Sequence, residues 1–570
     1  MLKEKLKPVL LLFIVVPLAV IIWYSPVLFK EHSTLISRDA LLLARNYAQF
    51  GVFGIEDDLN IVVSPPLVKE NANPSISGNK LTALIYGELF KVFGLPQYEN
   101  LIFFPAVILG LSLLFFTLTV YLSFNFRTAL LFSFIYILSP FFWQSTLYNF
   151  GTYEFALLFL SLFFLFFSLG KKNIFRFKYL FLILAGIFLA LAGLAKEAMF
   201  LLAPVLLLFL FFQKQRVYLL AVFVPFIVLV SLFWLPGMLF GENTYSFFLG
   251  GKTGELRKDF LDYGFYSHLF PDPYTYHFGR EEFLKGYEAE LLFSETDFFQ
   301  KIEMAKEIDF LGFKKPDLFS RFKIGVALLM RHLSRFLSIE DIGGPFIFIL
   351  FIFGFIYLYQ KNKYLFRFFV FWIIFAIFTI SFIVMGRRTH LMDFGWAIPL
   401  LVALGTIFLV QILTAHFKLG ERGKKIIMFF LPFLVLYNLI LSDHVLWGRE
   451  YDSETPLMAS VYAREVNKLE INDKEVIAVN VPGTEWAELN YLTNKSMVVF
   501  APETIEKLIK KGELSIAFDK FRVSYILGYS PELTREILEN SSVKNITTDE
   551  IDLSQPKVSK TKSWLMNLIR

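Results

Sequence analysis

Cysteine is absent from this 570-residue chain, and charged residues make up only 18% of it. Without cysteine there can be no disulfide framework, no thiolate nucleophile and no cysteine-ligated metal. The scarcity of charge, together with 56% hydrophobic residues, 71 phenylalanines and a mean hydropathy of +0.57, excludes a single soluble globule. Most of the chain is therefore predicted to lie in lipid.

Long apolar runs recur along the sequence. A helix that crosses a hydrocarbon core of about 30 Å needs about 17 to 25 mostly apolar residues, and the sequence offers eleven runs of this kind. The first run lacks a clear small-residue cleavage site at Tyr24-Ser25-Pro26, so we expect it to be retained. The runs cover approximately residues 8 to 29, 99 to 122, 128 to 147, 153 to 169, 178 to 195, 197 to 212, 217 to 240, 344 to 360, 366 to 385, 394 to 415 and 424 to 441.

Basic residues are concentrated in alternate loops between these runs, and such loops stay on the cytoplasmic side. The N-terminus and the loops near residues 127, 171 to 178, 214 to 216, 361 to 367 and 418 to 425 are therefore placed inside. An odd number of spans then puts residues 30 to 98, 241 to 343 and everything from 442 outside. We expect a multi-pass protein of the plasma (inner) membrane with an extracytoplasmic C-terminal domain.

The composition changes near residue 447 to that of a soluble α/β module. Apolar runs at 475 to 481, 497 to 500 and 522 to 527 alternate with helix-like segments at 485 to 491, 502 to 511 and 531 to 540, which predicts a small, mostly parallel sheet. This module lacks a glycine-rich phosphate loop, so we expect no nucleotide site in it. The expected fold class is a polytopic α-helical membrane domain, residues 1–446, followed by an α/β domain, residues 447–570.

The first outer loop has structure of its own. Residues 39 to 50 and 80 to 93 both alternate apolar and polar positions with helical spacing, so each is predicted to form a helix that lies along the membrane surface. The second outer segment, 241 to 343, is too long for a simple connector, and long ordered loops are more often functional than passive.

Several short motifs follow one another in a recognisable order. Ser37-Arg38-Asp39, just beyond the first span, leads into the stretch from Ala40 to Gly51, and Gly87 to Gly94, Leu138-Ser139-Pro140, Glu154 and Gly193 to Glu197 follow. This order resembles the GT-C superfamily of polytopic glycosyltransferases over roughly residues 1 to 415. Its members include protein O-mannosyltransferases, lipid A aminoarabinose transferases and rhizobial galacturonosyl transferases, all with polyprenyl-phosphate sugar donors.

The terminal module is also similar to one in many prokaryotic members, through Trp486, Tyr491-Leu492-Thr493 and the segment from Val523 to Leu527. One position departs from the pattern. Many relatives carry an Asp-Glu pair in the first loop, whereas Asp39 is followed by Ala40. The resemblance therefore does not select a second carboxylate.

The resemblance implies an inverting transfer of a sugar from a polyprenyl phosphate to an extracytoplasmic lipid, glycan or protein acceptor. Asp39 would be the general base that takes the acceptor's proton; the alternative is a helix N-cap, a common place for Asp. A transporter or lipid flippase is the rival class, although it would usually show paired repeats or charges near the bilayer midplane. A binding or assembly protein whose terminal module recruits a partner is a third possibility. Nucleic acid is not an expected partner.

The leaving lipid phosphate should need cations around its developing charge. Arg387, Arg388 and His390, between the ninth and tenth runs, are candidates, and headgroup contact by snorkelling is their alternative. Further substrate-binding candidates are Arg38, Glu154, Lys196 and Glu197. Lys196 and Glu197 interrupt an apolar stretch, where an ionisable residue suggests function, but an ordinary turn between two spans would also hold them. Glu154 has a plain alternative as an acid at a helix start.

A divalent metal is not firmly indicated. Glu56, Asp57 and Asp58 are weak candidate ligands, and their oxygens would suit Mg²⁺ or Mn²⁺. A solvated acidic loop is the alternative that the sequence favours.

Overall fold

The structure is a computed structural model in which the chain divides into two compact units. The first unit contains the described parts of Met1–Thr34, Glu99–Gly241 and Arg321–Ser453, and the second contains those of Leu35–Tyr98, Glu242–Ser320 and Glu454–Arg570. The described residues are 2–28, 38–52, 54–56, 73–74, 80–95, 103–139, 153–172, 177–240, 326, 329–330, 333, 344–379, 381, 395–418, 420–450, 458–472, 474–480, 485–500 and 502–546.

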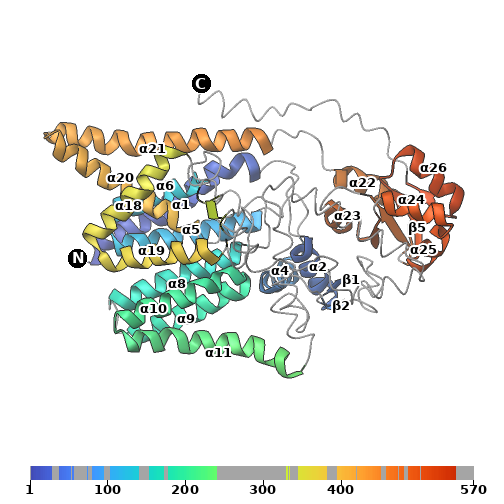
Figure 1. Ribbon diagram of the computed structural model, residues 1–570, viewed down its shortest axis with the longest axis horizontal. Helices are drawn as coiled ribbons and strands as arrows, with labels where there is room; N and C mark the ends of the chain where they lie inside the picture. The colour runs from blue at the N-terminus through green and yellow to red at the C-terminus, as the bar shows by residue number, and fades with distance from the viewer. Residues whose placement is uncertain are drawn as a thin grey trace. The chain divides into compact units, whose positions relative to one another are not determined.

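The first unit is a bundle of apolar helices (Figure 1). Its described helices are α1 (Leu2–Leu28), α5 (Phe103–Ser123), α6 (Phe126–Ile137), α8 (Glu154–Lys172), α9 (Lys178–Ala195), the 3₁₀ turn η2 (Glu197–Leu201), α10 (Leu202–Phe212), α11 (Arg216–Phe240), α18 (Pro345–Lys361), α19 (Lys363–Phe378), α20 (Ala397–His416) and α21 (Glu421–Glu450).

These helices carry apolar side chains on the outside as well as in the core. On α11 the exposed apolar residues recur at helical spacing, so they form one continuous face: Val217, Leu220, Val224, Ile227, Val228 and Leu232. A helix that is apolar all round suits lipid rather than water. Among the described residues, four helices are long and apolar enough to cross a membrane by length and composition: Phe104–Ser123, Glu154–Lys172, Lys178–Ala195 and Ala397–His416. The first unit is that of an integral membrane protein, while the number of spans stays a prediction.

Glycines allow the closest helix contacts in this unit. Gly354 of α18 faces the Leu401 carbonyl of α20, and Gly405 of α20 faces the Leu350 carbonyl of α18. In both places a Cβ would collide with backbone atoms. Small residues let helix backbones approach closely in membranes, where packing replaces the hydrophobic effect as the force that holds helices together.

Aromatic rings join four helices around Trp396, just before α20. Its ring centroid lies 4.6 Å from Phe164 of α8, 6.0 Å from Phe116 of α5 and 6.1 Å from Phe369 of α19. Such pairs contribute about 0.5–1.5 kcal/mol each beyond their area burial. The many phenylalanines therefore serve as packing contacts inside the bundle as well as lipid-facing surface.

The second unit begins with a helix pair from the first loop. Helix α2 (Arg38–Phe50) packs against α4 (Lys80–Phe93), and the short strands β1 (Gly54–Glu56) and β2 (Asn73–Pro74) pair antiparallel between them in sequence. Leu41, Leu42 and Leu43 of α2 are buried. The two helices approach each other closely at Gly87 of α4, since a Cβ there would lie 2.6 Å from the Tyr47 ring.

The rest of the second unit is a four-stranded parallel sheet with helices (Figure 1). The strand order is β4-β3-β5-β6, with Ile477 of β3 opposite both Met497 and Tyr525. Val476, Ile505, Phe518 and Ile526 contribute to a core of fully or almost fully buried residues. The elements are α22 (Met458–Asn467), β3 (Val476–Val479), α23 (Glu485–Thr493), β4 (Met497–Val499), α24 (Pro502–Lys511), α25 (Leu514–Lys520), β5 (Val523–Leu527), α26 (Pro531–Asn540) and β6 (Lys544–Asn545).

Candidate functional site

A buried carboxylate stands at the start of α8. Glu154 is the first residue of this helix and is 0% exposed. Its Oε2 accepts a hydrogen bond from the Tyr153 backbone N–H at 3.1 Å. The N-terminus of a helix favours negative charge because its N–H groups lack intrahelical partners. The helix end therefore explains why an acid is tolerated here, and its full burial sets it apart from an ordinary surface cap.

Lys196 lies at the same end of the α8–α9 pair. The chain leaves α9 at Lys196 in an extended conformation before η2 begins, and α8 and α9 pack along each other. The Lys196 Nζ lies 5.2 Å from the centroid of the Tyr153 ring. Tyr153 thus contacts Lys196 through its ring and Glu154 through its backbone N–H, so both predicted site residues lie at this end of the helix pair. A half-buried ammonium group there is chemically suited to bind a phosphate oxygen.

The other residues of the predicted set fall in different places. Glu197 opens η2 beside Lys196, and Glu56 ends β1, but their side chains are outside the described residues. Arg387, Arg388, His390, Asp57 and Asp58 lie wholly outside the described residues. In the described part of the chain, no group of three metal-ligating side chains forms a metal centre.

Arg38 and Asp39 belong to the second unit, where they form the first two positions of α2. Asp39 is thus within the first helical turn, a favourable position for a carboxylate next to the helix dipole. The side chains of both residues are outside the described set. The catalytic role of Asp39 stays a prediction.

Arg45 is a residue of the same helix that the sequence did not single out. Its side chain is 1% exposed, and Nη2 donates to Asn490 Oδ1 at 2.9 Å while Nη1 donates to the Asn490 backbone oxygen at 3.1 Å. Nη1 also reaches Asn494 Oδ1 at 3.3 Å, and Nε donates to Asn46 Oδ1 at 3.0 Å. The first loop and the terminal module are thereby joined within the second unit by a buried guanidinium.

Burial shifts the pKa values of two side chains at this contact, Arg45 and Tyr491. Desolvation lowers the pKa of Arg45 to about 10, against a partial opposing effect of Tyr491. The pKa of Tyr491 is raised to about 12, because burial outweighs the effect of the nearby cation. Arg45 is still charged at neutral pH, so its hydrogen bonds are charge-assisted.

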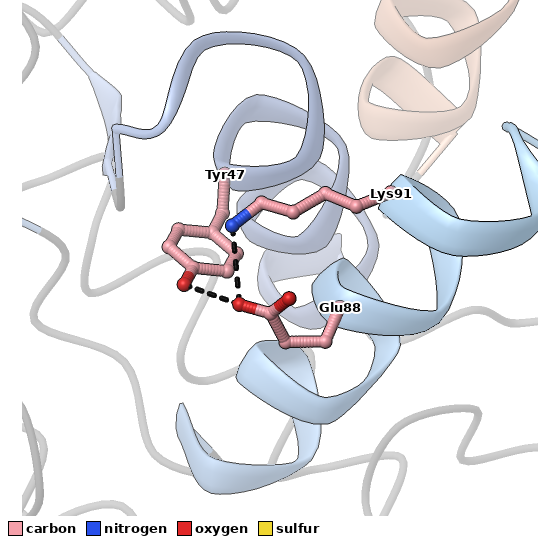
Figure 2. A network of polar contacts seen from close by, with 3 residues as sticks. All are labelled: Tyr47, Glu88 and Lys91. Carbon is pink, nitrogen blue, oxygen red and sulfur yellow. Dashed lines mark hydrogen bonds and ion pairs between the residues drawn. The ribbon is translucent and has the colours of Figure 1, made fainter.

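A second polar contact ties α2 to α4 on an exposed side (Figure 2). Tyr47 donates from its hydroxyl to Glu88 Oε1 at 2.5 Å, and Lys91 Nζ lies 3.1 Å from the same oxygen and 3.4 Å from the Tyr47 ring centroid. The Tyr47 and Lys91 hydrogen bonds lower the pKa of Glu88, and the Tyr47 contact is the largest cause that raises the pKa of Lys91. The three side chains form a polar contact between the two helices of the loop.

Comparison with known proteins gives a likeness of fold without a likeness of sequence. No protein-family model matches the chain, and no curated protein matches it. The oligosaccharyltransferase AglB from Archaeoglobus fulgidus, solved with an inhibitory peptide and a dolichol-phosphate, aligns with a TM-score of 0.53 at 12% identity. That alignment covers 91% of this chain and 69% of AglB.

A second structure of the Archaeoglobus fulgidus oligosaccharyltransferase, in complex with Zn and sulfate, gives a TM-score of 0.52 at 13% identity over 90% of this chain and 67% of that one. At 12 and 13% identity these two alignments show a likeness of fold alone, and that fold is the one that the sequence resemblance predicts. ArnT from Cupriavidus metallidurans in the apo state also aligns, at 11% identity over 94% of this chain and 89% of its own, but its TM-score of 0.35 is too low to establish a common fold.

Proposed function

We propose that the chain is an inverting glycosyltransferase that moves a sugar from a polyprenyl-phosphate donor to an extracytoplasmic lipid, glycan or protein acceptor. The observation that carries the proposal is the fold, which this chain shares with an oligosaccharyltransferase solved with a dolichol-phosphate. A fold alone does not define an activity, so the proposal also has to rest on the site residues.

The α8–α9 end supports a role in handling the lipid phosphate. A buried acid and a half-buried lysine gathered at one end of two apolar helices are costly for stability, and such residues in membrane proteins usually mark substrate sites. Lys196 would bind a phosphate oxygen of the donor, and Glu154 would orient the groups around it. Glu197, Arg38, Arg387, Arg388 and His390 belong to the same proposed substrate-binding set.

The proposed reaction is a single displacement. The Asp39 carboxylate takes the proton of the acceptor hydroxyl or amine as that atom attacks the anomeric carbon of the sugar. The bond between the anomeric carbon and the phosphate oxygen breaks, and the polyprenyl phosphate leaves with the electron pair. The configuration at the anomeric carbon is inverted. Cationic side chains stabilise the negative charge that develops on the leaving phosphate.

A divalent cation is a further part of the proposal. The oligosaccharyltransferase of similar fold was solved with Zn and sulfate. Glu56, Asp57 and Asp58 would supply hard oxygen ligands, which suit Mg²⁺ or Mn²⁺. A bound cation would add positive charge beside the leaving phosphate.

The test is transfer of radiolabelled sugar from polyprenyl-phosphate donors in membranes that contain the wild type or Asp39→Asn at matched amounts of folded protein. We expect Asp39→Asn to lower transfer at least about 100-fold, the lower end of a general base's contribution. Asp519→Asn is the matched control, because Asp519 is exposed in the terminal module, and it should keep wild-type activity.

The other outcomes are equally informative. Transfer by Asp39→Asn within about twofold of wild type removes Asp39 as the base. Absence of transfer by the wild type with every donor and acceptor offered contradicts the enzyme class and favours the transporter or flippase class.

A further inference from the structure

In the described contacts between α2 and the end of α23, a buried cation donates to uncharged oxygens. The Arg45 guanidinium donates to the side chain and backbone of Asn490 at 2.9 and 3.1 Å. Taking a cation out of water is expensive, and well-packed apolar residues of similar volume often stabilise a protein as well or better. Stability is therefore a poor explanation for an arginine here, whereas a fixed geometry is a good one, since the planar guanidinium has its donors in a rigid fork.

The acceptors are themselves held in place. Asn490 is 0% exposed and its Nδ2 donates to the Lys495 backbone oxygen at 2.8 Å. The Asn490 carbonyl lies in the last turn of α23, and it also accepts the Asn494 N–H at 2.9 Å. A helix C-terminus favours a cation. Asn494 follows the helix in a left-handed conformation with φ of 52°, which asparagine tolerates better than most residues.

The Arg45 guanidinium also contacts the first loop, to which Arg45 itself belongs. Nε of Arg45 donates to Asn46 Oδ1 at 3.0 Å, and Asn46 Nδ2 donates to the Gly54 backbone oxygen at 2.6 Å. Gly54 begins β1. Arg45 and Asn46 together thus connect α2, the strand that follows it and the end of α23. We call the set of Arg45, Asn46, Asn490 and Asn494 the Arg45 anchor.

We propose that Arg45 is a positioning residue through which the terminal module sets the orientation of α2, the helix that carries Asp39. This inference rests on the proposed role of Asp39. Asp39 precedes Arg45 by six residues in one helix, a rise of about 9 Å. A rotation or shift of α2 at the anchor is transmitted to its first turn because the helix is stiff. The terminal module then serves the chemistry by orienting the base rather than by recruiting a partner.

The test uses the full chain and compares Arg45→Lys, which keeps the charge but loses the fork, with Asn490→Ala and with the double variant. Misplacement of a reacting group by about 1 Å costs about 100-fold in rate. We expect each single variant to lower kcat about 10- to 100-fold per folded molecule, with KM for donor and acceptor within about twofold. The double variant should be no slower than the slower single variant, because both changes break the same contact.

Asn494→Ala and Lys468→Met complete the set. Asn494→Ala removes the longest bond of the anchor, 3.3 Å, and also places alanine at a left-handed φ of 52°; per folded molecule it should lower kcat less than Asn490→Ala does. Lys468 is exposed in the same unit and pairs with its near neighbour Glu465, so Lys468→Met should keep wild-type kcat. Asn494→Ala also keeps the inference testable if Arg45→Lys fails to fold.

Hydrogen exchange gives a readout that does not depend on sugar transfer. In Arg45→Lys the amides of α2 should exchange faster while those of β3 and β5 keep wild-type rates. Unchanged exchange in α2, or wild-type kcat in Arg45→Lys, overturns the inference. If Asp39→Asn stays active, Asp39 is not the general base. The effect of Arg45 on α2 is then still tested by hydrogen exchange in that helix.

Discussion

Two lysines flank α9, and each lies above a tyrosine ring at one end of the helix. Lys178 Nζ is 4.5 Å from the Tyr218 ring centroid, and Lys196 Nζ is 5.2 Å from that of Tyr153. The two contacts are alike in chemistry, but the ring that Lys196 contacts belongs to Tyr153, whose backbone N–H donates to the buried Glu154 carboxylate. Lys178 therefore serves as the comparison for the proposed contact of Lys196 with the donor phosphate.

We expect Lys196→Met to lower kcat/KM for the polyprenyl-phosphate donor about tenfold or more, since a hydrogen bond to a charged group contributes about 1.5–3 kcal/mol. Lys178→Met is the matched control and should leave kcat/KM within about twofold. Initial rates at varied donor concentration measure both. An equal loss in the two variants would mean that Lys196 acts in helix anchoring and not on the donor phosphate.

The contact of Tyr47, Glu88 and Lys91 makes a pH prediction. The pKa of Glu88 is lowered in the folded chain, chiefly by the Tyr47 hydroxyl. A carboxyl group with a lowered folded-state pKa stabilises the fold above its unfolded pKa, and this stabilisation is lost as the pH falls through the folded value. The ordinary value is 4.5. Tyr47→Phe should therefore lower Tm at pH 7 by more than it does near pH 3.

Thermal unfolding of the wild type and Tyr47→Phe across this range measures the difference. In a Glu88→Gln background the effect of Tyr47→Phe should lose its pH dependence, because the titrating group is gone. A constant difference in Tm from pH 7 to pH 3 in the native background would assign the effect of Tyr47 to packing against Gly87 instead.

At the scale of single residues, the sequence could identify chemistry but not partners. Glu154 stood out at the start of a span and Lys196 because it interrupts an apolar stretch, and both residues contact Tyr153 in the structure. Arg45 did not stand out, because it reads as the polar side of a surface helix. Its acceptor Asn490 is 445 residues away, and local spacing contains no signal for such a contact.

The element that depends most on backbone approach is the α18–α20 pair. A Cβ on Gly405 would collide with the Leu350 carbonyl and come within 2.9 Å of the Gly354 backbone nitrogen. Replacing Gly405 by valine should therefore force the helices apart, at a cost of at least about 1–3 kcal/mol. We expect a lower unfolding temperature and a smaller folded fraction in detergent.

Gly420→Ala is the control for this prediction, since nothing lies within 4 Å of a Cβ at that position. It should unfold like the wild type. Wild-type stability in Gly405→Val would show that α18 and α20 can separate without loss, which contradicts close packing as the force that holds them together.

The predicted helix bounds agree best with the structure where a local sequence pattern defines them. The amphipathic segment 80 to 93 coincides with α4, and the apolar run 178 to 195 coincides with α9. Within the predicted run 128 to 147, α6 ends at Ile137, and residues 140 to 147 lie outside the described residues. Leu138-Ser139-Pro140 follows, and a proline disfavours helix in the residue before it. Hydropathy does not indicate that α6 ends here, whereas the effect of a proline on the residue before it does.

At the scale of the whole molecule, the chain is assembled from distant parts of the sequence. The second compact unit combines described parts of Leu35–Tyr98 and Glu454–Arg570, and the division into residues 1–446 and 447–570 stays a prediction. Composition separates apolar from polar sequence, and it cannot reveal that a polar loop packs on a polar module. The Arg45 anchor is one of the contacts between them.

The absence of cysteine makes the orientation of the whole molecule directly measurable, because any introduced cysteine is then the only thiol. Basic residues near 361 to 367 and 418 to 425 predict that these loops are cytoplasmic and that the terminal module is outside. Lys468→Cys and Asn540→Cys lie at exposed sites of that module, and Lys363→Cys and Lys418→Cys lie in the loops. A membrane-impermeant maleimide on intact cells should label the first pair alone, and all four after the membrane is opened. Labelling of the loop pair alone on intact cells would invert the topology, and the proposed acceptor would then have to be cytoplasmic.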